Sequence, residues 1–239
     1  TLSMLRYFFD LEGADEHRKL FDGMAVSRDE ALMKEMGTRP VLFFSMRGWK
    51  ANDWTTMQET IIDGLQQVAQ GYKYLLQSDR ADSIDRQMLQ DIYDGPASVS
   101  SLRTAPARLL RMLEAHYGKK AVFLLDEYDV PIQSAWEHGY YEQAIDFFRV
   151  FLTTSLKSNP SLDFAVLTGV LRISKESIFS DLNNLDVDSI LHPKYPTVLG
   201  FTSEEVEKIA NDLGHADRLS ELREWYDGYR IDGHEIYNP

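Results

Sequence analysis

Two adjacent carboxylates follow the most apolar run of the sequence. Residues 121–125 (AVFLL) carry no polar side chain, and Asp126 and Glu127 come directly after them. Such a run is typical of a buried strand in a parallel sheet, and ligands bind at the carboxyl ends of such strands. An apolar strand ending in Asp-Glu is the Walker B pattern, in which Asp binds the Mg²⁺ of a nucleoside triphosphate and Glu orients the attacking water. We therefore predict that Asp126 binds metal and cofactor and that Glu127 is catalytic, the alternative being an ordinary loop start.

A second strand-like run ends in a hydroxyl residue. Residues 163–167 (DFAVL) are followed by Thr168 and Gly169. In nucleotide hydrolases whose catalytic Glu follows the Walker B strand, a small polar residue on the neighbouring strand senses the γ-phosphate, and Thr168 fits this sensor role. An ordinary strand-end threonine is the alternative. Arg172 and Lys175 follow, and either could pair with a phosphate. If the two strands are neighbours, Thr168 should lie next to Asp126, with Arg172 near the same edge.

Several other kinds of site are excluded by the residues that are missing. The phosphate-loop pattern G-x-x-x-x-G-K-[ST] does not occur, and the single Gly-Lys pair, Gly118-Lys119, precedes a strand instead of following one. The absence of cysteine removes thiolate nucleophiles, disulfides and Cys-type zinc sites. The six histidines are far apart in the sequence, so a dedicated histidine metal site is not expected.

Helices and apolar runs alternate along the chain. Apolar spacing and capping signals predict helices near 2–9, 15–21, 29–36, 53–75, a shorter one that ends near 93, and further helices near 109–118, 140–157, 203–213 and 216–226. They also predict strands at 40–46, 121–126, 163–168 and 197–201, a loop at 95–101, and a hairpin that turns at Asp232-Gly233. Thr202 and Glu205 form a predicted capping box. Apolar strands separated by helices indicate a parallel sheet covered on both faces, which is an α/β fold.

The composition is that of a globular protein. The 239 residues are 44% hydrophobic and carry 25 Lys and Arg against 38 Asp and Glu, a formal net charge of −13. This acidity argues against a broad phosphate-binding surface but leaves room for a local basic patch. With neither a transmembrane run nor a signal peptide pattern, we expect a soluble, cytoplasmic protein. The four tryptophans are expected to be packing residues: Trp49, Trp54, Trp136 and Trp225.

Four groups of motifs resemble the AAA-ATPase-like family of prokaryotic P-loop proteins. They are LSMLRYFF at 2–9, LDEYDVPI at 125–132, LTGVLRISKESIFS at 167–180 with LNNL at 182–185, and WYDGY at 225–229 with IYNP at 236–239. The resemblance implies ATP and Mg²⁺ as ligands, Asp126 and Glu127 as the Walker B pair, Thr168 as the sensor and Arg172 as the arginine of the following motif. It also implies a phosphate loop just before the first helix, with Thr1 either as the Mg²⁺-binding hydroxyl of that loop or just after it.

The resemblance further implies that the chain is a fragment. Residues 1–201 would be a P-loop NTPase (AAA-like) core without its phosphate-loop strand, and 202–239 would begin a small helical lid with a hairpin. The strand order would be 163–168, 121–126, 40–46, with a bare edge or a pairing with 197–200 beside 164–167. A nuclease-like domain of the PD-(D/E)XK type would follow in the full-length chain. We expect the isolated chain to be inactive and to bind Mg²⁺-ATP weakly or not at all.

Two other functions remain as alternatives to an ATPase. One is a non-catalytic protein-interaction module on a nucleotide-binding scaffold, whose acidic surface contacts a partner. The other is a metal-dependent nuclease that uses Asp126, Glu127 and Asp129. Nuclease chemistry would need a further carboxylate and a lysine at this strand end, whereas ATPase chemistry needs a phosphate loop beside it.

Overall fold

The protein divides into two compact units, Thr1–Asn183 and Asn184–Pro239. A computed structural model describes residues 2–95, 97–157, 159–170, 185–189, 194, 196–197 and 200–237. The boundary predicted at 201–202 lies inside the second unit. Among the helices of the described residues, none combines the length and the apolar character that a membrane span requires.

The first unit is built on a parallel sheet in the order β1 (Val41–Ser45), β2 (Ala121–Asp126), β3 (Leu162–Leu167). The central strand β2 is fully buried from Ala121 to Leu125, as expected for a strand with a neighbour on each side and helices on each face. The predicted order of these three strands is confirmed. No fourth strand of this sheet occurs among the described residues.

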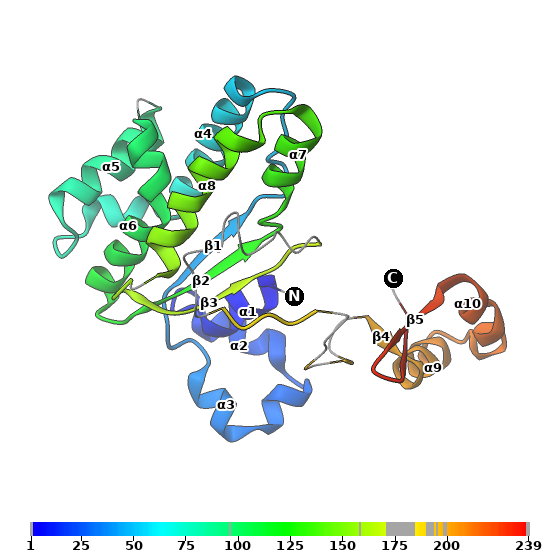
Figure 1. The fold of residues 1–239 in the computed structure, drawn as a ribbon. Helices are drawn as coiled ribbons and strands as arrows, with labels where there is room; N and C mark the ends of the chain where they lie inside the picture. The colour runs from blue at the N-terminus through cyan, green and yellow to red at the C-terminus, as the bar shows by residue number, and fades with distance from the viewer. Residues whose placement is uncertain are drawn as a thin grey trace. The chain divides into compact units, whose positions relative to one another are not determined.

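Helices cover both faces of this sheet (Figure 1). On one face α1 (Leu2–Phe9) places Leu2 against Val41, Val122 and Leu124. On the other face lie α6 (Val99–Tyr117) and α8 (Tyr141–Leu156). There the Phe44 ring meets the rings of Phe123 and Phe151 edge to face, with centroids 5.8 and 5.9 Å apart. The covered α/β sheet predicted from the sequence is confirmed.

Capping residues set the bounds of most helices. The remaining helices of the first unit are α2 (Ala14–Arg18), α3 (Glu30–Glu35), α4 (Trp54–Gly71), α5 (Ser83–Asp94) and α7 (Val130–His138), with short 3-10 turns at Lys19–Phe21, Ala25–Arg28 and Lys73–Gln77. The predicted loop at 95–101 is shorter than expected, because the Ser98 side chain accepts the backbone N–H of Ser101 and starts α6 at Val99. Helix α7 was not predicted from the sequence, although Pro131 in its first turn is a helix-start signal.

The side chain of Tyr72 forms hydrogen bonds with the backbone of β1, an edge strand of the described sheet. The buried Tyr72 hydroxyl accepts the backbone N–H of Phe43 and donates to the carbonyl of Val41, both at 3.0 Å. Burial raises the pKa of Tyr72 to about 12, so the hydroxyl stays a donor even in alkaline solution. Two backbone groups of an edge strand are thereby satisfied by one side chain.

The second unit is a small module of three antiparallel strands and two α-helices. Its sheet has the order β4 (Phe201–Thr202), β6 (His234–Tyr237), β5 (Asp227–Ile231), and its helices are α9 (Ser203–Asp212) and α10 (Leu219–Tyr226), preceded by a 3-10 turn at Ala216–Arg218. The predicted capping box at Thr202 and Glu205 is present. The predicted hairpin is also present, and the φ values of Asp232 and Gly233, 47° and 82°, fit the left-handed turn that joins such strands.

Two expectations are wrong, one about a strand of this unit and one about the tryptophans. Of the strand predicted at 197–201, Thr197 lies in a turn and only Phe201 is in a strand, while Val198 and Leu199 lie outside the described residues. That strand, β4, pairs with β6 and is not an addition to the parallel sheet. Trp49 is buried as expected, but Trp136 in α7 and Trp225 in α10 are 72% and 77% exposed.

A partly buried acid at the end of α1 should make stability depend on pH. Burial raises the pKa of Asp10 to about 6, despite the N–H of Glu12 and the charge of Arg6. When an acid has a higher pKa in the folded state than in the unfolded state, the protein loses stability as the pH rises from about 4 to about 6. We expect Asp10→Asn to stabilise the protein by about 1–3 kcal/mol at pH 7.5 and by little at pH 4. Urea unfolding at both pH values measures this, with the exposed Asp22→Asn as control. An equal effect at both pH values would contradict it.

Candidate functional site

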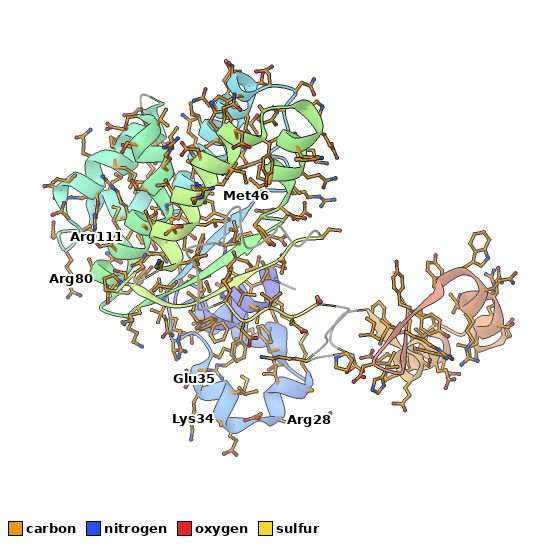
Figure 2. The ribbon with its side chains drawn as sticks, viewed as in Figure 1. Arg28, Lys34, Glu35, Met46, Arg80 and Arg111 are labelled. Atoms are coloured by element: carbon orange, nitrogen blue, oxygen red, sulfur yellow. The ribbon has the colours of Figure 1, made fainter. Side chains whose placement is uncertain are left out.

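The carboxyl ends of the three parallel strands bring the candidate residues together. Ser45 of β1 is in register with Asp126, and Leu125 is in register with Leu167. Met46, labelled in Figure 2, donates its backbone N–H to the carbonyl of Asp126 at 2.9 Å. Beyond β3, Thr168 donates its N–H to the carbonyl of Leu125 at 2.9 Å. The residues that follow β2 and β3 are thus held at one edge of the sheet.

The side chains of Asp126 and Thr168 are in direct contact. The Thr168 hydroxyl donates to Asp126 Oδ1 at 2.5 Å, a short hydrogen bond. Both residues are partly buried. Within the described part of the chain, Asp126 Oδ2 has no hydrogen-bond partner, so one oxygen is oriented and the other is left available. The predicted neighbourhood of these two residues is confirmed, whereas their chemical roles remain predictions.

Glu127 has an unusual backbone conformation for a residue with a side chain. Its φ is 55°, in the left-handed region that costs a non-glycine residue about 1 kcal/mol or more. A tight turn accompanies it, in which the Glu127 carbonyl accepts the N–H of Val130 at 3.2 Å. The carboxylate is partly exposed, and its Oε1 lies 4.0 Å from Nε of the exposed Arg47. Strained backbone of this kind concentrates at functional sites, where it aims a side chain.

The Asp129 side chain is bonded to backbone and does not form a metal-holding group with Asp126 and Glu127. It is 1% exposed, and its Oδ2 accepts the backbone N–H of Val170 at 2.9 Å. Among the described residues, no group of three His, Asp or Glu side chains is arranged to hold a metal ion. The nuclease hypothesis needs Asp126, Glu127 and Asp129 around one ion, and the engagement of Asp129 with backbone disfavours it.

Sequence comparison assigns the chain to a family. A family model described as AAA-ATPase_like, Predicted AAA-ATPase, matches residues 1–179. The chain belongs to this predicted AAA-ATPase family. The uncharacterized protein in the vnfD 5' region of Azotobacter chroococcum mcd 1 is 38% identical over 133 residues, which are 55% of this chain and 25% of that protein. The match thus spans about a quarter of that relative's length. No solved structure matches.

The two remaining predicted site residues of this AAA-ATPase-like chain are not placed. Thr1 and Arg172 lie outside the described residues, as does Lys175, the other candidate phosphate partner. The described donor set is Asp126, Glu127 and Thr168, all with oxygen atoms, which are the ligands that Mg²⁺ prefers. A carboxylate oxygen without a hydrogen-bond partner, as at Asp126 Oδ2, fits a magnesium ligand.

Sequence reasoning missed two residues at this edge of the sheet. A Cβ on Gly169 would lie 2.6 Å from Asp129 Oδ1, so this position has no room for a side chain. Arg47 brings a positive charge near Glu127 from the loop after β1. A glycine directly after a strand is a signal of close backbone approach and could have indicated the first. No sequence signal points to the second, since its position depends on the pairing of β1 with β2.

Proposed function

We propose that the first unit is the catalytic core of an ATPase that hydrolyses Mg²⁺-ATP. The observation that carries the proposal is the hydrogen bond from Thr168 to Asp126 at the carboxyl end of the central strand, in a chain of a predicted AAA-ATPase family. It supports a shared site for a Walker B carboxylate and a sensor hydroxyl. The carboxyl ends of parallel strands are also where nucleotides bind in open α/β sheets.

In this proposal each residue has one task. Asp126 would hold the Mg²⁺, while the Thr168 hydroxyl bonds Oδ1 and so orients the carboxylate. Glu127 aligns the attacking water and accepts a proton from it, and its left-handed backbone, with a φ of 55°, turns the chain directly after β2. Arg172 pairs with a phosphate, and Thr1 contributes a hydroxyl at the cofactor. The bound Mg²⁺ supplies charge neutralisation at the phosphoryl group being transferred.

The proposed ATPase site also requires a phosphate loop. Backbone N–H groups and a lysine must neutralise the triphosphate, because carboxylates alone repel it. The pattern that supplies them is absent here. We therefore propose that the chain is part of a longer ATPase and that it binds Mg²⁺-ATP weakly by itself. A nuclease-like domain elsewhere in that protein is a further expectation from the family resemblance.

The test is nucleotide binding by the full-length protein that contains this chain. We expect Asp126→Ala to weaken Mg²⁺-ATP binding at least about tenfold, since even losing a residue that only orients a metal ligand typically costs about 10–100-fold. With EDTA in place of Mg²⁺, wild type and variant should bind ATP alike. Calorimetry measures both, and the exposed Asp79→Ala serves as control. Unchanged Mg²⁺-ATP binding by Asp126→Ala would contradict the proposal.

One observation favours the alternative of a protein-interaction module. The second unit has an apolar groove of about 640 Å³, lined by side chains of α9 and α10 that include Val206, Ile209, Leu222 and Trp225, and by Leu213 directly after α9. Acidic residues outnumber basic ones in this unit. Such a groove fits an amphipathic helix that carries Lys or Arg beside its apolar face. The Asp126→Ala experiment separates the two functions, because binding in this groove does not depend on Asp126.

A further inference from the structure

Asp129 is a buried carboxylate that is used in an uncommon way. It directly precedes α7, yet its side chain makes no capping hydrogen bond to that helix. Instead Oδ2 accepts the N–H of Val170, which lies on the segment that follows β3. Burying a carboxylate at 1% exposure is costly unless it is well bonded, so this contact has a structural purpose.

The segment after β3 approaches Asp129 very closely. A Cβ on Gly169 would lie 2.6 Å from Oδ1 and 2.9 Å from Cγ of Asp129, and 3.0 Å from Cε1 of Tyr128. Gly169 is not among the glycines with positive φ. Its lack of a side chain therefore serves the close approach and not an unusual backbone conformation.

Side-chain packing does not hold this segment in place. The Val170 side chain is 90% exposed, so its apolar surface contributes little. The backbone is held by successive hydrogen bonds: Thr168 N–H to Leu125, Tyr128 N–H to the Thr168 carbonyl at 3.1 Å, and Val170 N–H to Asp129. The last of these comes from a side chain and can be removed by substitution.

We propose that Asp129 is a positioning residue for the ATPase site: by holding the Val170 N–H it fixes the backbone on the far side of Gly169 and so directs the Thr168 hydroxyl onto Asp126. This inference rests on the proposed function. Thr168 lies two residues before Val170, so release of Val170 leaves the Thr168 backbone held by its own bonds to Leu125 and Tyr128 and weakens the hold on its hydroxyl. A sensor hydroxyl that drifts from Asp126 leaves the metal-binding carboxylate without its orienting bond.

Two substitutions of Asp129 separate the hydrogen bond from the volume of the side chain. Asp129→Asn keeps an oxygen that accepts the Val170 N–H, whereas Asp129→Leu has similar size and no acceptor. In the full-length protein we expect Asp129→Leu to lower kcat by about 10- to 100-fold, since small misplacements of reacting groups cost this much. The Kd for Mg²⁺-ATP should also rise, by up to about tenfold, because Asp126 loses the bond that orients it. Asp129→Asn should keep kcat within about threefold of wild type.

A measurement without nucleotide keeps the inference testable if the protein proves not to be an ATPase. Amide hydrogen exchange at Val170, followed by NMR, should be at least tenfold faster in Asp129→Leu and unchanged in Asp129→Asn. Gly169→Ala gives a second variant with Asp129 intact, and its Cβ should displace the carboxylate and also speed exchange at Val170.

The outcomes decide the two claims separately. Absence of ATP hydrolysis by the wild-type protein would overturn the proposed function, and the exchange rates would still show whether Asp129 holds Val170. A folded Asp129→Leu protein that keeps slow exchange at Val170 would overturn the contact. Fast exchange with wild-type kcat would overturn the positioning role.

Discussion

Glu127→Gln in the full-length protein is expected to lower ATP turnover by at least about 100-fold and to leave the Kd for Mg²⁺-ATP within a few-fold of wild type. Glutamine has the same shape as glutamate but cannot accept a proton from the attacking water, and a positioned general base contributes about 10²–10⁴-fold. Because Asp126 and Thr168 are unchanged, binding should persist. Steady-state phosphate release measures turnover, and calorimetry measures binding.

The control for this prediction is Glu142→Gln, an exposed glutamate in the first turn of α8. A second variant, Glu127→Gly, removes the carboxylate and relieves the left-handed backbone, which has a φ of 55°. It should therefore lose turnover while the free energy of unfolding rises by up to about 1 kcal/mol. Normal turnover by Glu127→Gln would remove the catalytic assignment of Glu127.

The largest stability effect is expected at a buried ion pair between α5 and α6. Asp85 is fully buried, and Arg111 donates to both of its carboxylate oxygens, Nε at 2.6 Å and an NH2 nitrogen at 2.5 Å. Arg108 is more distant, at 3.9 Å. The Arg111 side chain, labelled in Figure 2, is more than half exposed. The carboxylate is therefore the partner that cannot regain water if the pair is broken.

We expect Arg111→Met to lower the free energy of unfolding by about 3–5 kcal/mol, because it leaves Asp85 buried without its two charge-assisted bonds. Asp85→Leu should cost less, since the remaining guanidinium can turn into solvent. The double variant should lie closer to wild type than Arg111→Met alone, because it leaves no buried charge. Urea unfolding followed by circular dichroism measures all three. A loss below about 1 kcal/mol for Arg111→Met would contradict the argument.

Local features of the fold could be predicted because their causes lie within a few residues. The run at 121–125 is apolar on every residue, which indicates a strand buried on both faces. The capping box at Thr202 and Glu205 and the turn at Asp232-Gly233 are each closed by bonds between residues at most a few positions apart. The ends of two apolar runs indicated that Thr168 lies next to Asp126, and family resemblance added the order of the parallel strands, both of which the structure confirms.

The residues of the candidate site could be predicted from their type and place, since Asp-Glu directly after an apolar run indicates the carboxyl end of a buried strand. The orientation of those residues did not follow. Nothing in the letters DEYD distinguishes the partly exposed Glu127 from the buried Asp129. That difference arises because the chain turns sharply at Glu127 and because Gly169 lets a second segment approach the Asp129 carboxylate.

By itself the sequence determined most of the helices and the parallel strands, the acidic composition and the candidate carboxylates of this protein, because these depend on short-range periodicity and on residue chemistry. Only the tertiary structure decided that β4 pairs with β6, that Trp225 is exposed and that Asp129 holds Val170. Each of these depends on which distant segment occupies the neighbouring space. Several segments of similar local pattern compete for such a place, and packing and hydrogen bonding across the whole unit select one of them.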